Sequence, residues 1–169
     1  MPEDEPDEFA EFYASCKDRC LRAAVAHGMS PAGAEDAVAE AFARAFATWS
    51  TVRRHHSPAA WVLRTAVNAD ISWWRRRRRE TTTADQDHLA PLVPSPATGE
   101  DVIDAMAAIR TLPDRQREVV VLRHLLDLDT ATTAAVLGIA PGTVTAHLHR
   151  AHVYLRAALT TDVHEGTPR

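Results

Sequence analysis

Hydrophobic residues recur every three or four positions along most of this chain, a spacing typical of amphipathic helices. The first such segment covers about residues 7–27 and ends before Gly28. A second begins at Ser30-Pro31, and a third begins at Ser57-Pro58 and extends to about Arg79. Serine followed by proline favours a helix start, because the serine side chain caps the helix and proline fits the first turn. We therefore predict three long helices in the first half of the chain.

The second of these helices has a clear apolar face. Val38, Phe42, Phe46 and Trp49 are spaced by three or four residues, so we expect all four to be buried. A short polar stretch, Ser50–His56, follows and separates this helix from the third.

Residues 81–100 have no helical periodicity and contain a threonine run and a run rich in proline and serine. This composition predicts a linker. Residues 101–159 are again periodic, so the predicted fold class is all-α, with no strand. We expect two small helical domains, residues 1–80 and 101–169, the second ending in a short tail and joined to the first by the linker 81–100.

The C-terminal domain contains a predicted helix-turn-helix. A short helix over residues 130–137 is followed by the turn Gly138-Ile139-Ala140 and by a longer helix from Pro141. Val144, Leu148, Ala151 and Leu155 define the inner face of that longer helix. At 100° per residue, the outer face then presents Thr143, Thr145, Ala146, His149 and Arg150, which would meet the DNA major groove. An ordinary helical hairpin is the alternative interpretation of this segment.

The composition limits the function classes further. The chain has 169 residues, of which 46% are hydrophobic, and its N-terminus is acidic. No apolar run approaches the roughly 18 residues of a membrane span, so we expect a soluble, cytoplasmic protein without membrane insertion. Cys16 and Cys20 are too few for a disulfide framework and are expected to be reduced packing residues.

Charge is distributed unevenly along the chain. The net charge is −4, yet residues 1–50 carry four basic and ten acidic side chains, whereas residues 51–80 carry eight basic and two acidic ones. A basic block inside an acidic chain is an electrostatic signature of nucleic-acid binding that the total charge conceals.

That basic block is also rich in tryptophan. Trp61, Trp73 and Trp74 share the third predicted helix with five consecutive arginines, 75–79. Such a run binds phosphates without reading sequence, and neighbouring indole rings can stack on unpaired bases. Trp61 is also expected to contribute to the core, and Trp73 and Trp74, about 100° apart, cannot be equally buried.

Four segments, in order along the chain, together resemble the extracytoplasmic-function sigma factors, the small two-domain class of bacterial RNA polymerase specificity subunits. The segments are 34–42 (AEDAVAEAF), 60–68 (AWVLRTAVN) with the arginines that follow it, 112–119 (LPDRQREV) and 137–144 (LGIAPGTV). The resemblance covers about residues 8–159. It implies a non-catalytic protein that binds core RNA polymerase, melts the −10 promoter element with its first domain, and binds the −35 element with its second.

The resemblance also implies roles for individual residues. The acidic residues Glu35, Asp36 and Glu40 would contact the clamp helices of the largest polymerase subunit. The loop residues Arg53, Arg54, His55 and His56 would capture a flipped −10 base beside Asn68. The other −10 contacts expected are Trp61, Arg64, Trp73, Trp74, Arg75 and Arg76, and the outer-face residues named above would bind the −35 duplex. Promoter DNA and core polymerase are thus the expected partners, with an anti-sigma protein, which the sequence does not identify, as a third.

The sequence departs from the family pattern at a few positions. Thr133 stands where an acidic residue is usual, Ser72 stands where aspartate is common, and Arg150 is the permanent charge kept on the outer face of the longer helix.

Two other function classes remain to be weighed. A stand-alone helix-turn-helix regulator is the alternative function, although it would not need the tryptophan–arginine block. An enzyme has little support, because no phosphate loop or nucleophile motif occurs, and we expect no cofactor. His149 and His152 share a helix face, but no cysteine or carboxylate completes a ligand set there, so we expect no metal site.

Overall fold

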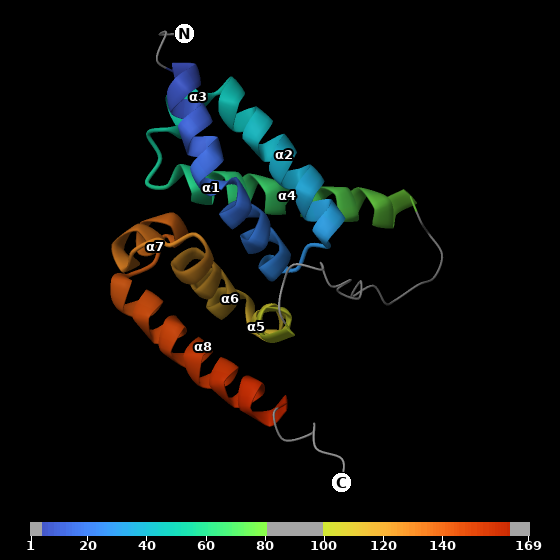
Figure 1. Ribbon diagram of the computed structural model, residues 1–169, viewed down its shortest axis with the longest axis vertical. Coiled ribbons are helices and arrows are strands. Elements are labelled where there is room, and N and C mark those ends of the chain that lie inside the picture. Colours follow the sequence, from blue (N-terminus) through green and yellow to red (C-terminus); the bar gives the residue numbers. More distant parts are fainter. Residues whose placement is uncertain (1–4, 81–99, 163–169) are drawn as a thin grey trace. The chain divides into compact units, whose positions relative to one another are not determined.

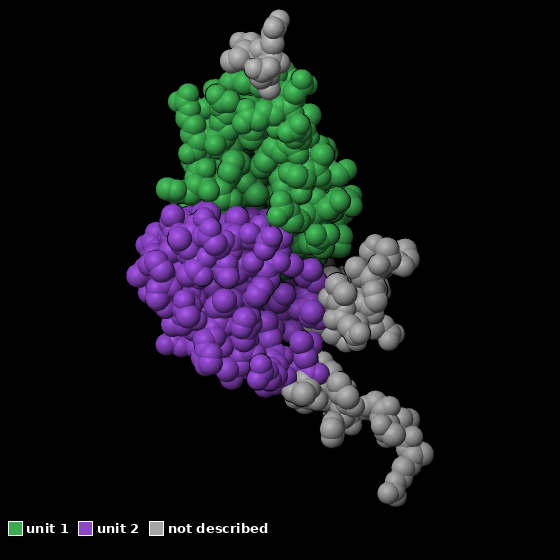
Figure 2. Space-filling view, turned by 60° about the vertical axis from the view of Figure 1, so that its left-hand side comes forward, with its two compact units in different colours: residues 1–93 green, residues 94–169 purple. Residues whose placement is uncertain are grey.

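The computed structural model of this protein describes residues 5–80 and 100–162, and within these ranges every regular element is a helix (Figure 1). Side chains are described over residues 5–70 and 105–159. The chain divides into two compact units, unit 1 (residues 1–93) and unit 2 (residues 94–169), which Figure 2 colours separately. The predicted all-α fold class is confirmed. The predicted linker, 81–100, lies outside the described residues except for Glu100, which begins a helix.

Unit 1 is built from three long helices and one short helix. They are α1 (Glu5–His27), α2 (Pro31–Ala47), α3 (Trp49–Val52) and α4 (Pro58–Glu80). Helices α1, α2 and α4 pack on one another, and α3 contacts α1 and α2. The serine caps hold as expected, since the Ser30 hydroxyl accepts a hydrogen bond from the Gly33 amide at 3.2 Å and the Ser57 hydroxyl accepts one from the Ala60 amide at 3.1 Å.

The core of unit 1 combines small residues with an aromatic cluster. Ala23, Ala24 and Ala26 of α1 are fully buried, which lets the helices approach closely. Phe12 packs against Trp49 with tilted rings and centroids 4.9 Å apart, and the partly exposed Tyr13 meets Phe42 edge-on at the same distance. Aromatic pairs at these separations add to the stability gained by burial.

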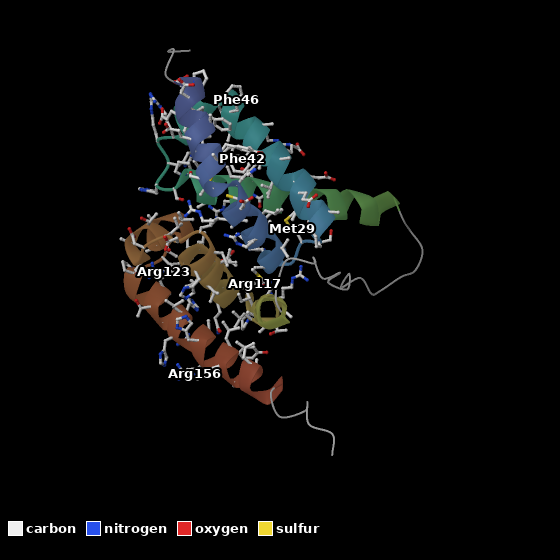
Figure 3. The ribbon with its side chains drawn as sticks, in the orientation of Figure 1. Met29, Phe42, Phe46, Arg117, Arg123 and Arg156 are labelled. Atoms are coloured by element: carbon white, nitrogen blue, oxygen red, sulfur yellow. The ribbon has the colours of Figure 1, made fainter. Side chains whose placement is uncertain are left out.

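One predicted core residue is not buried. Val38, Phe42 and Trp49 are buried as expected, but Phe46 retains 43% of its accessible surface (Figure 3). The reason is that α2 ends at Ala47 and the chain turns into α3, so Trp49 occupies the interior and Phe46 packs on the Phe9 ring, 5.0 Å away, from the outside. The polar stretch predicted at 50–56 accordingly begins inside α3.

Unit 2 consists of α5 (Glu100–Thr111), α6 (Asp114–Val120), the π-helical turn η1 (Val121–Leu125), α7 (Thr130–Leu137) and α8 (Pro141–Asp162). Helix α8 packs against α5, α6 and α7, so it is the element around which the unit is organised. After Val120 the helix continues with the wider π-helical repeat of η1, which ends at Leu125. Asp127 then takes a left-handed conformation, φ 56°, to lead into α7.

The helix-turn-helix is present as predicted. Gly138 ends α7 in the left-handed conformation, φ 65°, which glycine adopts without steric cost. The Ile139 amide bonds the Ala134 carbonyl at 3.1 Å, and the Thr143 amide bonds the Ala140 carbonyl at 2.9 Å, so the turn is closed on both sides. The core beneath it is formed by Val119, Ala134 and Val144, with Leu137, Ile139 and Leu148 packed around them.

Candidate DNA and polymerase interfaces

The outer face of α8 is free of packing contacts with its own unit. Val144 and Ala151 are fully buried and fix the orientation of the helix. The residues predicted to face outward are all exposed, and they are Thr143, Thr145, Ala146, His149 and Arg150. The Thr145 hydroxyl donates to the Pro141 carbonyl at 3.2 Å, within the first turns of the helix. The N-terminal half of α8 therefore presents a mostly neutral surface with one guanidinium.

Helix α7 supports that surface. The Asp129 carboxylate accepts a hydrogen bond from the Thr132 amide at 2.6 Å and caps the helix. Hydrogen bonds from the backbone and side chain of Thr132 lower the pKa of Asp129, so the carboxylate stays charged at the positive end of the helix dipole. Thr133, at the position where the family usually has an acid, is fully buried, and within the described residues its hydroxyl oxygen has no hydrogen-bond partner.

The loop between α3 and α4 carries the four residues expected to capture a base. Arg53, Arg54, His55 and His56 are all exposed. Two backbone hydrogen bonds hold the start of this loop. The Arg54 amide donates to the Thr51 carbonyl at 3.1 Å, and the His55 amide donates to the Val52 carbonyl at 3.0 Å.

Two side-chain contacts tie the same loop to its surroundings. The Arg53 guanidinium donates to the Glu8 carboxylate of α1 at 2.8 Å. The His55 ring lies 6.4 Å from the Trp61 ring, centroid to centroid, which joins the loop to the start of α4.

One face of α4 continues from that loop. Trp61, Arg64 and Asn68, spaced by three and four residues, lie on the same side of the helix. Trp61 is half-buried rather than a full core residue, while Arg64 and Asn68 are exposed. The opposite side packs inward through Val62, Leu63 and Ala66. The loop and this face of α4 together carry seven of the predicted −10 residues.

The remaining predicted −10 residues lie farther along α4. The helix continues to Glu80, so its backbone carries Trp73, Trp74, Arg75 and Arg76 on the last turns. Their side chains lie outside the described part of the chain. Just before them, burial raises the pKa of Asp70.

The acidic residues of α2 form a separate surface. Glu35, Asp36 and Glu40 are all exposed, while Ala34, Val38 and Ala41 on the other side of the helix are buried. Glu40 forms an ion pair with Arg44 one turn later. Asp36 and Glu35 have no such partner among the ion pairs of the described residues, so their charge faces solvent.

Both cysteines belong to the core and not to a site. Cys16 and Cys20 are buried and free, and the Cys20 thiol lies 3.8 Å from the Ala59 carbonyl of α4. Hydrogen bonding to Cys16 and burial raise the pKa of Cys20, which keeps that thiol protonated. Within the described ranges there is no cluster of three or more potential metal ligands, and no helix there is both long and apolar enough to cross a membrane.

Two residues at these surfaces carry contacts that the sequence did not indicate. Glu8 lies 45 positions before Arg53, and His124 of η1 faces His152 of α8 with their Nε2 atoms 2.9 Å apart. Burial, together with His152 and Arg123 nearby, lowers the pKa of His124. No local motif marks either pair, because each depends on how distant helices pack.

Comparison with known proteins assigns both units. The family model for sigma-70 region 2 matches residues 12–80, and that for sigma-70 region 4 matches residues 103–153. These matches cover most of α1, all of α2, α3 and α4, and unit 2 from α5 through the first part of α8.

Curated relatives and a solved structure agree with these matches. The RNA polymerase sigma-E factor of Streptomyces coelicolor is 34% identical over 90% of this chain and 86% of its own length. The ECF RNA polymerase sigma factor SigM of Mycobacterium tuberculosis is 31% identical over 75% of this chain and 64% of its own. The fold is similar to that of the sigma factor RpoE of Bartonella quintana, solved in complex with the anti-sigma factor NepR, with a TM-score of 0.72 and 23% identity over 92% of this chain and 98% of that one. The chain therefore belongs to the sigma-70 family of RNA polymerase sigma factors, in its extracytoplasmic-function group.

Proposed function

We propose that this protein binds core RNA polymerase and directs it to promoters, with unit 1 engaging the −10 element and unit 2 engaging the −35 element. The observation that carries the proposal is the coexistence, in one chain, of a helix-turn-helix with an exposed outer face and a tryptophan-bearing helix next to an ordered basic loop. The protein is then a non-catalytic specificity subunit that acts where RNA polymerase acts, in the bacterial cytoplasm.

Unit 1 has separate surfaces for its two proposed partners. The acidic face of α2, formed by Glu35, Asp36 and Glu40, would bind the polymerase clamp, and its exposed carboxylates suit a basic partner surface. The loop 53–56 and the Trp61 face of α4 would hold the unpaired −10 strand. Extracting a base from the stack costs a few kcal/mol, which a basic loop beside an aromatic ring is suited to recover.

Unit 2 would read duplex DNA through the N-terminal half of α8. Thr143, Thr145 and Ala146 offer hydroxyl and methyl groups to base edges, and Arg150 offers one charged donor. With a single permanent charge on this face, the binding energy of unit 2 at the −35 element should be modest. Most of the electrostatic attraction to DNA should come from unit 1.

An anti-sigma protein is a further proposed partner. The sigma factor RpoE of Bartonella quintana was solved bound to one, and the acidic face of α2 offers a polar surface on which a regulator could compete with polymerase. Whether this chain has such a regulator is tested by affinity capture from its own organism with the wild type and with Asp36→Arg as bait.

Run-off transcription tests the proposed function directly. Core polymerase with this protein, on a promoter library from its own genome, should give initiation that depends on the protein. Co-elution of the purified chain with core polymerase should accompany it. Tight binding to a duplex operator without affinity for core polymerase would instead establish the stand-alone helix-turn-helix regulator.

A further inference from the structure

Two histidines of unit 2 contact each other through their ring nitrogens. His124 lies in η1 and His152 lies on α8, 28 positions later. Their Nε2 atoms are 2.9 Å apart, whereas the ring centroids are 5.1 Å apart, so the two Nε2 atoms are the parts of the rings that face each other. Both residues are exposed.

The backbone on each side of the pair is held by buried neighbours. On α8, Ala151 is fully buried directly before His152. Leu122 of η1 and Leu126, which caps η1, are buried on either side of His124, and the Leu126 amide donates to the Val121 carbonyl at 3.1 Å. The two imidazoles are therefore brought together by packing that does not depend on their own contact, a preorganised arrangement.

The chemistry of such a pair extends beyond one hydrogen bond. Between two neutral imidazoles only one nitrogen carries the shared proton, and the other presents a lone pair. When a divalent transition-metal ion binds, the ring that carries this proton on Nε2 releases it to solvent and takes up a proton on Nδ1, so both Nε2 atoms donate lone pairs to the ion. Zinc–nitrogen bonds of 2.0–2.1 Å in tetrahedral geometry place two ligand nitrogens about 3.4 Å apart, so these rings would separate by about half an ångström. Rotation of two exposed side chains provides that movement.

We propose that His124 and His152 form a two-imidazole binding site for a divalent transition-metal ion of the zinc class, with water completing the coordination sphere. The described residues contain no larger cluster of histidine, cysteine, aspartate or glutamate, so the site differs from a four-ligand structural zinc site and binds more weakly. A bound ion cross-links η1 to α8 and thereby stabilises the folded state of unit 2.

Zinc titration of the full chain, purified without a polyhistidine tag, tests this site. We expect His124→Gln and His152→Gln each to weaken the tightest zinc binding seen by calorimetry at least tenfold. The matched control is His149→Gln, which removes an exposed histidine from the same helix three positions before His152 and should keep the wild-type affinity. Equal affinity in the wild type and in both site variants would overturn the proposal.

A second measurement needs no variant. In long-range ¹H–¹⁵N spectra of the wild-type chain, zinc should shift the Nε2 resonances of His124 and His152 together and leave those of His149 in place. Shifts confined to His149 and His152 would assign zinc to an i, i+3 pair on α8 and refute the site. Because neither measurement involves polymerase or promoter DNA, failure here would leave the proposed sigma function untouched.

Discussion

Shortening the Val144 side chain tests whether this residue lies in the core of the helix-turn-helix. Val144 is fully buried against Val119 and Ala134, and it sets which face of α8 points outward. The Val144→Ala change removes two methyl groups, worth about 1.6 kcal/mol at 0.8 kcal/mol per buried carbon. The cavity left behind adds to this loss, so the free energy of unfolding of unit 2 should fall by about 2–3 kcal/mol.

The matched control is Val153→Ala on the same helix. Val153 keeps 59% of its surface exposed, so the identical chemical change should cost less than about 0.5 kcal/mol. Native-state hydrogen exchange of peptides from α7 and α8 in the full chain measures both. Protection of the slowest amides should fall about 30- to 150-fold for Val144→Ala, at 1.4 kcal/mol per factor of ten. Equal effects of the two variants would refute the assigned orientation of α8.

Four further changes test other parts of the molecule. Ser57→Ala removes the hydrogen bond that caps the Ala60 amide and should destabilise unit 1 by about 1 kcal/mol. Urea unfolding followed by tryptophan fluorescence measures this, because all four tryptophans lie within residues 49–74. An unchanged unfolding midpoint would show that the cap does not stabilise the unit. Thr133→Val replaces a buried hydroxyl that lacks a partner with a methyl group of the same shape, and it should stabilise unit 2 by up to about 1 kcal/mol. Unfolding followed by circular dichroism measures this. A loss of stability would show that the hydroxyl has a hydrogen-bond partner. Arg150→Ala should weaken −35 duplex binding by about 1–3 kcal/mol in fluorescence anisotropy and reduce its salt dependence, whereas an unaltered affinity would contradict the proposed face. Asp36→Arg should weaken co-elution with core polymerase while the circular dichroism spectrum stays the same. Undiminished co-elution would show that polymerase binds a surface other than the acidic face of α2.

Local signals in the sequence predicted the elements well. The two serine–proline starts and the glycine stop of α7 act within a few residues of themselves, so they needed no knowledge of the rest of the fold. The same holds for the outward face of α8. Once Val144 and Ala151 are assigned to the core, the helical repeat alone places Thr145 and Arg150 outside.

Features that depend on distant packing could not be predicted in this way. Phe46 fits the buried stripe of α2 by spacing, but the chain leaves that helix one residue later and Trp49 takes the interior position. The widening of α6 into η1 has no sequence signature here, and it places His124 opposite His152. Pairings over such separations arise from the tertiary arrangement, and periodicity within one helix carries no information about them.

The contact between Glu8 and Arg53 places a carboxylate beside the basic loop that we propose to bind the −10 strand. The pair is 2.8 Å apart, but the two side chains remain 47% and 36% exposed, and an exposed ion pair of this kind contributes at most about 1 kcal/mol. A phosphate contact by the same guanidinium also releases condensed counterions from DNA, a gain that the carboxylate cannot offer. We therefore expect a DNA phosphate at the proposed −10 surface to displace Glu8 at little cost. The Glu8 carboxylate pairs with the Arg53 guanidinium in this structure, and the proposed −10 contact would replace that pair.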